Sequence, residues 1–133
     1  MLQQNEAVVL AYVDAFNRGD LEGLCKLFAP DAQVWGVLGF GGMDVVRPVW
    51  KDLIECLQMK LRVEAMIAQG DTVAVRYVES GTSVRAFRGL GPTGKSYELV
   101  AMEWFVVKDG LIHRRWGARD FASQSRQLGF PLQ

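Results

Sequence analysis

Apolar side chains recur at helical spacing along the first 18 residues of the chain. They lie at i, i+1, i+4, i+5 and i+8, on one helix face: Val8, Val9, Tyr12, Val13 and Phe16. This pattern predicts a helix over residues 3–18, which Gly19 is suited to end. Asp20 is a favourable N-cap, so we expect a second, short helix over residues 21–28.

A short strand and a glycine-rich segment follow these two helices. Residues 32–35 are predicted as a strand, and the glycines of residues 36–42 come directly after it. These glycines match no phosphate-binding motif, so we interpret the segment as a flexible rim or lid. Asp44 is expected to cap a third helix that reaches about residue 59.

From residue 60 onward the pattern changes to strands rich in Val, Tyr and Thr. Turns at residues 70–71, 89–95 and 108–110 separate them. The predicted strands cover residues 61–68, 72–87, 97–107 and 111–120. Helices first and a long antiparallel meander afterwards are typical of an α+β fold, in which helices cover one face of a curved sheet.

Composition and charge narrow the class of protein. The chain has 133 residues, of which 50% are hydrophobic and 23% are charged, and its formal net charge is zero. We therefore expect one folded domain over residues 1–133 and no nucleic-acid partner. Residues 1–60 hold 8 acidic and 5 basic side chains, whereas residues 61–133 hold 7 acidic and 10 basic ones. The basic excess includes Arg114, Arg115, Arg119 and Arg126. These arginines either form a solvated face or give the protein a mild preference for anionic ligands.

Other sequence features bear on compartment and cofactors. No apolar run approaches the roughly 18 residues of a membrane helix, so we expect no membrane partner. The N-terminus lacks the basic and apolar regions of a secretory signal, and we expect a cytoplasmic protein. Cys25 and Cys56 form no CxxC pair and the chain has one His, so we expect reduced thiols, no metal site and no cofactor.

Three stretches resemble a known family. The segment AYVDAFNRGDLEGLCKLFAPDAQV resembles the opening of nuclear transport factor 2-like domains. The segments GLGPTGKS and DGLIHRRWGARDFASQSRQLG resemble the SnoaL-like polyketide cyclase branch, which is related to ketosteroid isomerase. The resemblance implies a cone-shaped fold, with a bent antiparallel sheet wrapped around the N-terminal helices and one internal pocket. Because this superfamily includes cyclases, isomerases, epoxide hydrolases and non-catalytic binders, the fold alone does not assign a function.

The resemblance also suggests catalytic positions. The acid/base Asp of the SnoaL-like cyclases falls at Gly117 and their His falls at Glu103, while Asp120 matches a second acidic position. The epoxide-hydrolase branch also needs an Asp near Gly117. In the ketosteroid isomerases, Tyr12 and Glu103 match the two oxyanion-hole donors, whereas the base would fall at Gly36. The chain thus resembles an isomerase with a donor pair and no obvious base.

The register of the last hairpin decides which way Glu103 points. A two-residue turn pairs Glu103 with Trp116, and a three-residue turn with a glycine bulge pairs it with Arg115. The resemblance favours the second register, which places on the inward face Leu99, Ala101, Glu103, Phe105, Arg115 and Gly117. The opposite face then carries Val100, Met102, Trp104, Val106, Ile112 and Trp116. A face this apolar is typical of a homodimer contact through the outer side of the sheet.

Each candidate residue has a structural interpretation beside the functional one. Glu103 and Arg115 can be an ion pair, in which case Glu103 stays ionised and can serve as a base. Tyr12 can be a core tyrosine, and Asp120 can cap the turn that follows it. Pocket-lining candidates beside the inward strand residues are Phe16, Trp35 and Trp50, although core packing suits the two tryptophans equally well.

Three functions remain open. The first is a cofactor-independent isomerase or cyclase that acts on an apolar carbonyl compound, polyketide- or steroid-like. The second is a small-ligand binding protein that has lost the chemistry, and an epoxide-hydrolase-type reaction is a further alternative. The third is an interaction role through the open sheet face.

Overall fold

The computed structural model describes residues 4–36 and 38–131. The predicted helix start at Gln3 and Val37 of the glycine-rich segment lie outside these residues. The elements, in chain order, are α1 (Gln4–Arg18), α2 (Leu21–Cys25), β1 (Phe28–Gly36), β2 (Gly39–Gly41), α3 (Met43–Leu57), β3 (Lys60–Gln69), β4 (Thr72–Thr82), β5 (Ser96–Lys108), β6 (Leu111–Arg119) and α4 (Phe121–Leu128).

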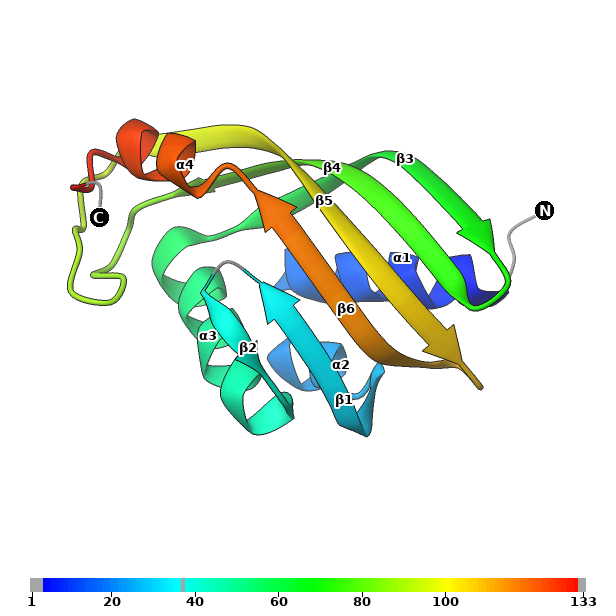
Figure 1. The fold of residues 1–133 in the computed structure, drawn as a ribbon. Coiled ribbons are helices and arrows are strands. Elements are labelled where there is room, and N and C mark those ends of the chain that lie inside the picture. Colours follow the sequence, from blue (N-terminus) through cyan, green and yellow to red (C-terminus); the bar gives the residue numbers. More distant parts are fainter. Residues whose placement is uncertain (1–3, 37, 132–133) are drawn as a thin grey trace.

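The six strands form one open, curved sheet, and α1, α2 and α3 lie on the same side of it (Figure 1). The strand order is β2-β1-β6-β5-β4-β3. All neighbouring strands are antiparallel except β1 and β6, which pair in parallel. The α+β fold is confirmed, and the sheet that was expected to be antiparallel contains this one parallel pair. Strands β3 to β6 follow one another as an antiparallel meander. Strand β1 comes earlier in the chain and lies at the β6 edge of this meander, where it runs parallel to β6.

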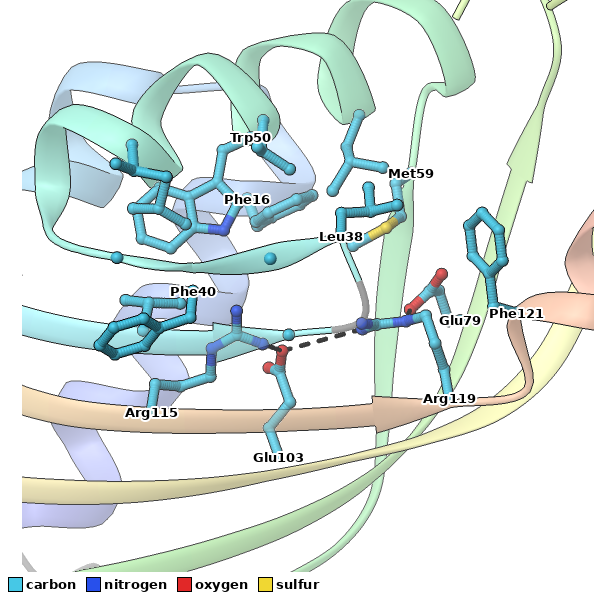
Figure 2. Close-up of a pocket in the computed structure, with 18 of the residues that line it drawn as sticks. Phe16, Leu38, Phe40, Trp50, Met59, Glu79, Glu103, Arg115, Arg119 and Phe121 are labelled. Atoms are coloured by element: carbon cyan, nitrogen blue, oxygen red, sulfur yellow. Dashed lines mark hydrogen bonds and ion pairs between the residues drawn. The ribbon is translucent and has the colours of Figure 1, made fainter. Parts of the chain in front are cut away.

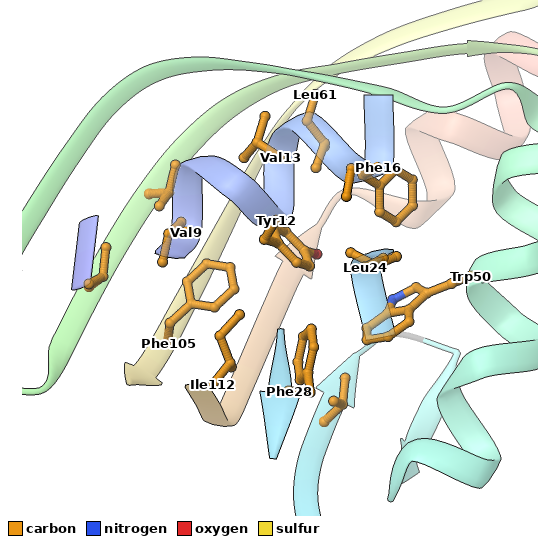
Figure 3. Close-up of a cluster of buried hydrophobic side chains, with 14 of the residues drawn as sticks. Val9, Tyr12, Val13, Phe16, Leu24, Phe28, Trp50, Leu61, Phe105 and Ile112 are labelled. Atoms are coloured by element: carbon orange, nitrogen blue, oxygen red, sulfur yellow. The ribbon is translucent and has the colours of Figure 1, made fainter. Parts of the chain in front are cut away.

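The main core lies between α1 and the inner face of the sheet (Figure 3). The predicted apolar face of α1 supplies Val9, Tyr12, Val13 and Phe16, all of which are buried. They meet inward-facing residues of the sheet such as Phe105 and Ile112. The Tyr12 ring lies 5.1 Å from the Phe105 ring in an edge-on contact. Helix α1 therefore positions its tyrosine at the centre of the sheet.

The hairpin of β5 and β6 has neither predicted register. The turn is a two-residue one, since Lys108 pairs with Leu111, but a bulge at His113 shifts the pairing by one residue beyond it. As a result, Glu103 lies opposite Gly117 rather than Arg115 or Trp116. Glu103 and Arg115 nevertheless both face inward, as expected. Ile112 is buried as well, in contrast to its expected outward place, because the bulge reverses the alternation of the strand.

Several element ends differ from the predicted ones. Helix α2 ends at Cys25, since Phe28 is already paired with Ile112 of β6. Part of the glycine-rich segment forms the short strand β2 against β1. Helix α3 begins after Gly42, and Asp44 lies in its first turn rather than at its cap. Strand β4 ends at Thr82, and α4 follows β6 as a full helix where the sequence indicated only a turn.

Candidate functional site

A pocket opens between the inner face of the sheet, α1, α3 and the rim strand β2. Its apolar wall includes Phe16, Trp50 and Met59, and Leu38 and Phe40 lie at its rim (Figure 2). The floor carries charged side chains from three neighbouring strands: Glu79, Glu103, Arg115 and Arg119. The cavity volume is about 60 Å³. An apolar pocket with a few convergent polar groups is the usual form of a small-molecule site.

Glu103 is the central charge of the floor. Its side chain is only 2% exposed and forms an ion pair with Arg115 through Oε2. The same oxygen accepts a hydrogen bond from the Tyr12 hydroxyl at 3.3 Å and lies 3.8 Å from Nη2 of Arg119. In Figure 2 the two guanidinium groups lie on either side of this carboxylate. All of these positive or donating contacts therefore gather on Oε2.

Glu79 is the second buried carboxylate, and both of its oxygens are engaged. Oε1 accepts a hydrogen bond from Nε of Arg119 at 2.6 Å, and Oε2 accepts one from the Tyr97 hydroxyl at 2.7 Å. The Glu79 side chain is fully buried. Arg119 thus lies between two carboxylates, and the four charges on the pocket floor balance.

Burial and charge hold the site in defined protonation states. Burial, followed by the negative charge of Glu103, raises the pKa of Tyr12 far above its usual range. Burial and the same carboxylate raise the pKa of Tyr77. Burial favours the neutral form of Arg119, but Glu79 and Glu103 outweigh it and raise the Arg119 pKa. Tyr12 is therefore a neutral donor and Arg119 a permanent cation.

Three buried polar atoms of the site have no hydrogen-bond partner among the described residues. They are Oε1 of Glu103, Nε of Arg115 and the hydroxyl of Tyr77. Leaving a buried donor or acceptor unpaired typically costs about 1–3 kcal/mol.

The structure brings together five of the residues expected in the site. Tyr12, Phe16, Trp50, Glu103 and Arg115 all line the pocket. Other expected residues are not among those that line the pocket. They are the catalytic candidate Asp120 and five residues expected in the pocket wall: Trp35, Leu99, Ala101, Phe105 and Gly117.

The reasons for these differences are local. Trp35 stacks on Trp116 at 4.7 Å, on the outer face of the sheet. Ala101 and Phe105 face inward but are packed in the core, and Leu99 packs against both apolar clusters. Gly117 has no side chain to reach the pocket. Asp120 is exposed and caps α4, since its Oδ1 accepts a hydrogen bond from the Ser123 amide at 3.0 Å.

Sequence reasoning missed Glu79 as a site residue and treated Arg119 only as part of the basic excess. Glu79 does carry a signal in the sequence. It occupies an inward phase of β4, two residues beyond Tyr77 and four beyond Val75, where an apolar residue is the usual occupant. A lone acidic residue on an apolar face needs a buried cation, but the sequence does not say that Arg119 is close enough to provide it.

No group of three or more His, Cys, Asp or Glu side chains suited to a metal ion occurs within residues 4–36 and 38–131. In that same part of the chain, no helix has the length and apolar character needed to span a membrane.

The fold is an α+β cone with a pocket on the inner face of its sheet, and comparison with known proteins gives its family. The chain belongs to the SnoaL-like domain family, whose profile matches residues 9–115. None of the curated proteins compared with the chain matches it. Solved structures resemble it closely over nearly the whole chain.

One of these structures is IdmH, a candidate polyketide cyclase from Streptomyces antibioticus. It is 30% identical, with a TM-score of 0.82, over 96% of this chain and 99% of IdmH. A candidate polyketide cyclase from Xanthomonas campestris pv. campestris is 26% identical, with a TM-score of 0.87, over 95% of this chain and 97% of that one. AclR, a candidate hydroxylase from Streptomyces galilaeus, is 25% identical, with a TM-score of 0.85, over 94% of this chain and 80% of AclR.

Proposed function

We propose that the protein is a cofactor-independent isomerase or cyclase that enolises an apolar, polyketide- or steroid-like carbonyl compound. The observation that carries this proposal is the asymmetry of Glu103. The Glu103 side chain lines the pocket, and its Oε2 is surrounded by Arg115, Arg119 and Tyr12, whereas its Oε1 is buried and has no hydrogen-bond partner among the described residues. A carboxylate that lines a pocket and has one oxygen free of hydrogen bonds is placed to accept a proton.

The reaction we propose begins with transfer of a proton from the carbon next to the substrate carbonyl to Oε1 of Glu103. The electron pair of the broken C–H bond forms a C=C bond with the carbonyl carbon, and the π electrons of the carbonyl group move to its oxygen, which gives an enolate. Guanidinium N–H groups of Arg115 or Arg119 donate hydrogen bonds to this oxygen, where negative charge develops. Glu103 then returns the proton, either to a different carbon of the enolate or to the alkoxide that forms when the enolate carbon attacks a second carbonyl.

Tyr12 has a different role from the oxyanion donor suggested by the resemblance. Its hydroxyl donates to Glu103 rather than into the open part of the pocket. We assign Tyr12 as a positioning residue that holds Oε2 and thereby orients Oε1. The guanidinium groups, rather than Tyr12, then donate hydrogen bonds to the substrate oxygen.

The substrate has to widen the pocket before it can bind. The cavity volume of about 60 Å³ is small beside the roughly 300–1,000 Å³ of typical ligand sites. The rim residue Phe40 is 56% exposed, and among the described residues β2 is held mainly by its pairing with β1 and by its contact with α3. Outward movement of β2 is therefore the simplest way to admit a ligand with two or more rings.

Deuterium exchange tests the proposal without knowledge of the natural substrate. In D2O, the wild-type protein should accelerate exchange of the α-protons of 2-tetralone, followed by NMR. Glu103→Gln should lower this rate by about 10²–10⁴, the usual contribution of a positioned base. The control Glu64→Gln changes an exposed glutamate of β3 and should retain the wild-type rate. Equal exchange rates for the wild type and Glu103→Gln would overturn the proposal.

A ligand-binding protein without chemistry is the second candidate. It is favoured by Gly117 and Gly36, where related enzymes carry an acidic residue, and by the charge balance of the pocket floor. The same glycines leave an epoxide-hydrolase-type reaction without its acid near residue 117. Binding of 2-tetralone, measured by quenching of tryptophan fluorescence, together with no acceleration of exchange would favour this second candidate.

A further inference from the structure

Glu79 is the most deeply buried charge on the pocket floor, and the proposed reaction gives it no role. It lies in β4, and its fully buried carboxylate is bound on one side by Arg119 and on the other by Tyr97. With both oxygens engaged in these bonds, it is less available than Glu103 to act as a base. Its contacts point instead to an effect on Arg119.

Arg119 needs such an anchor because Glu103 already attracts it. Nη2 of Arg119 lies 3.8 Å from Oε2 of Glu103, which is an ion-pair contact longer than a good hydrogen bond. Nε is fixed 2.6 Å from Glu79, on the other side of the guanidinium (Figure 2). Without Glu79, the buried cation would have Glu103 as its remaining carboxylate and would move toward it.

We infer that Glu79 is a positioning residue that holds Arg119 as a separate cation of the pocket, available to the substrate oxygen. The role of Arg119 toward the substrate oxygen rests on the proposed function, whereas the position of its guanidinium beside Glu79 does not. By keeping Arg119 from closing onto Glu103, Glu79 also keeps the proposed base from being fully neutralised by two cations. Through the guanidinium of Arg119, Glu79 therefore affects both proton transfer to Glu103 and the stabilisation of charge on the substrate oxygen.

Tyr97 holds Glu79 from the far side. Its ring belongs to the second apolar cluster, with Leu57, Phe87, Leu128 and Phe130, beneath α4 and the 83–95 segment. Burial, followed by the charge of Glu79, raises the pKa of Tyr97, so its hydroxyl stays protonated and donates. The position of Arg119 thus depends on a hydrogen-bonded chain that ends in this second cluster.

The first test measures Arg119 directly and needs no turnover. The Nε–H of Arg119 donates to a buried carboxylate, so its NMR signal should exchange slowly with solvent. Glu79→Gln should speed this exchange at least about tenfold, because a bond to a charged acceptor becomes one to a neutral amide. Tyr97→Phe keeps the carboxylate and should give a smaller increase, which covers the case in which Glu79→Gln folds poorly. Glu64→Gln should leave the signal unchanged. An Arg119 signal that is the same in wild type, Glu79→Gln and Tyr97→Phe would overturn the inference.

The second test is a double-mutant cycle on 2-tetralone exchange. In the wild-type background, Glu79→Gln should lower kcat about tenfold or more and change KM less, since the contact with Arg119 matters most when charge develops on the substrate oxygen. In the Arg119→Gln background, Glu79→Gln should have no further effect. An equal loss in both backgrounds would contradict action through Arg119. If the wild type accelerates no exchange, the proposed function fails alone, and the Arg119 signal still decides the positioning role.

Discussion

The guanidinium of Arg115 occupies the space that a side chain at residue 117 would need. A Cβ placed on Gly117 would clash with Nη1 of Arg115 and lie 3.3 Å from Oε2 of Glu103. A side chain at residue 117, where the resemblance places an acidic residue in the SnoaL-like cyclases, would therefore require Arg115 to shift from its place beside Glu103. The glycine at 117 thus leaves room for the ion pair between Glu103 and Arg115.

We predict that Gly117→Ala displaces Arg115 and loses about 1–3 kcal/mol in free energy of unfolding, the usual cost of overpacking a filled site. Urea denaturation measures this loss. Gly36→Ala is the matched control on the other side of the guanidinium, where a Cβ would lie 3.7 Å from Nη2 of Arg115, an ordinary contact. Equal losses for the two variants would show that the clash with Nη1 is not the cause.

At the scale of elements, the β5–β6 hairpin determines which charges face the pocket. Asp109 and Gly110 both have positive φ, 53° and 78°, which suits a tight two-residue turn. The bulge at His113 then allows Ile112 and Arg115 to face the same side. Strict alternation along β6 would place these two residues on opposite faces. Sequence periodicity therefore predicted both strands of the hairpin but not the bulge, whose position depends on pairing with β5 and β1.

Helix α4 gives a prediction about Asp120. Because Asp120 is exposed and bonds the Ser123 amide, its main role is that of an N-cap. Asp120→Ala should lower the free energy of unfolding by about 1 kcal/mol. Asp120→Asn should have nearly the wild-type free energy of unfolding, because Asn is an equally good cap. Both variants should keep the wild-type rate of 2-tetralone exchange. If either variant has the wild-type free energy of unfolding but a much lower rate of 2-tetralone exchange, Asp120 is a catalytic residue after all.

At the scale of the whole molecule, one row of apolar side chains crosses all six strands on the outer face of the sheet. The paired residues, in order, are Phe40, Trp35, Trp116, Trp104, Ala74 and Ile67. Ile67 is 71% exposed and Trp104 is 51% exposed. An apolar surface of this extent is typical of an interaction site, and a two-fold axis through it would let the same row serve both partners.

We propose that a second copy of the chain covers this row. Analytical ultracentrifugation at micromolar concentration should then show a dimer. Trp104→Glu should weaken it by about 30-fold or more, as expected for a central aromatic residue. Val84→Glu places the same charge on an exposed apolar position beyond the end of β4 and should leave the dimer intact. A monomeric wild type at that concentration would contradict the proposal.

Local patterns in the sequence determined most of the elements, and the family resemblance indicated the side of the sheet on which Glu103 lies. Helical spacing predicted the buried face of α1, and alternation along β5 predicted that Ala101, Glu103 and Phe105 share one face, because both periods follow from backbone geometry alone. The family resemblance, rather than the period, indicated that this face is the inward one. Only the tertiary structure decided the contacts among the charges. Glu79 and Arg119 are 40 residues apart and bond because strands β4, β5 and β6 lie side by side. That proximity depends on strand order, on one bulge and on the absence of a side chain at Gly117, none of which has a local signature in the sequence.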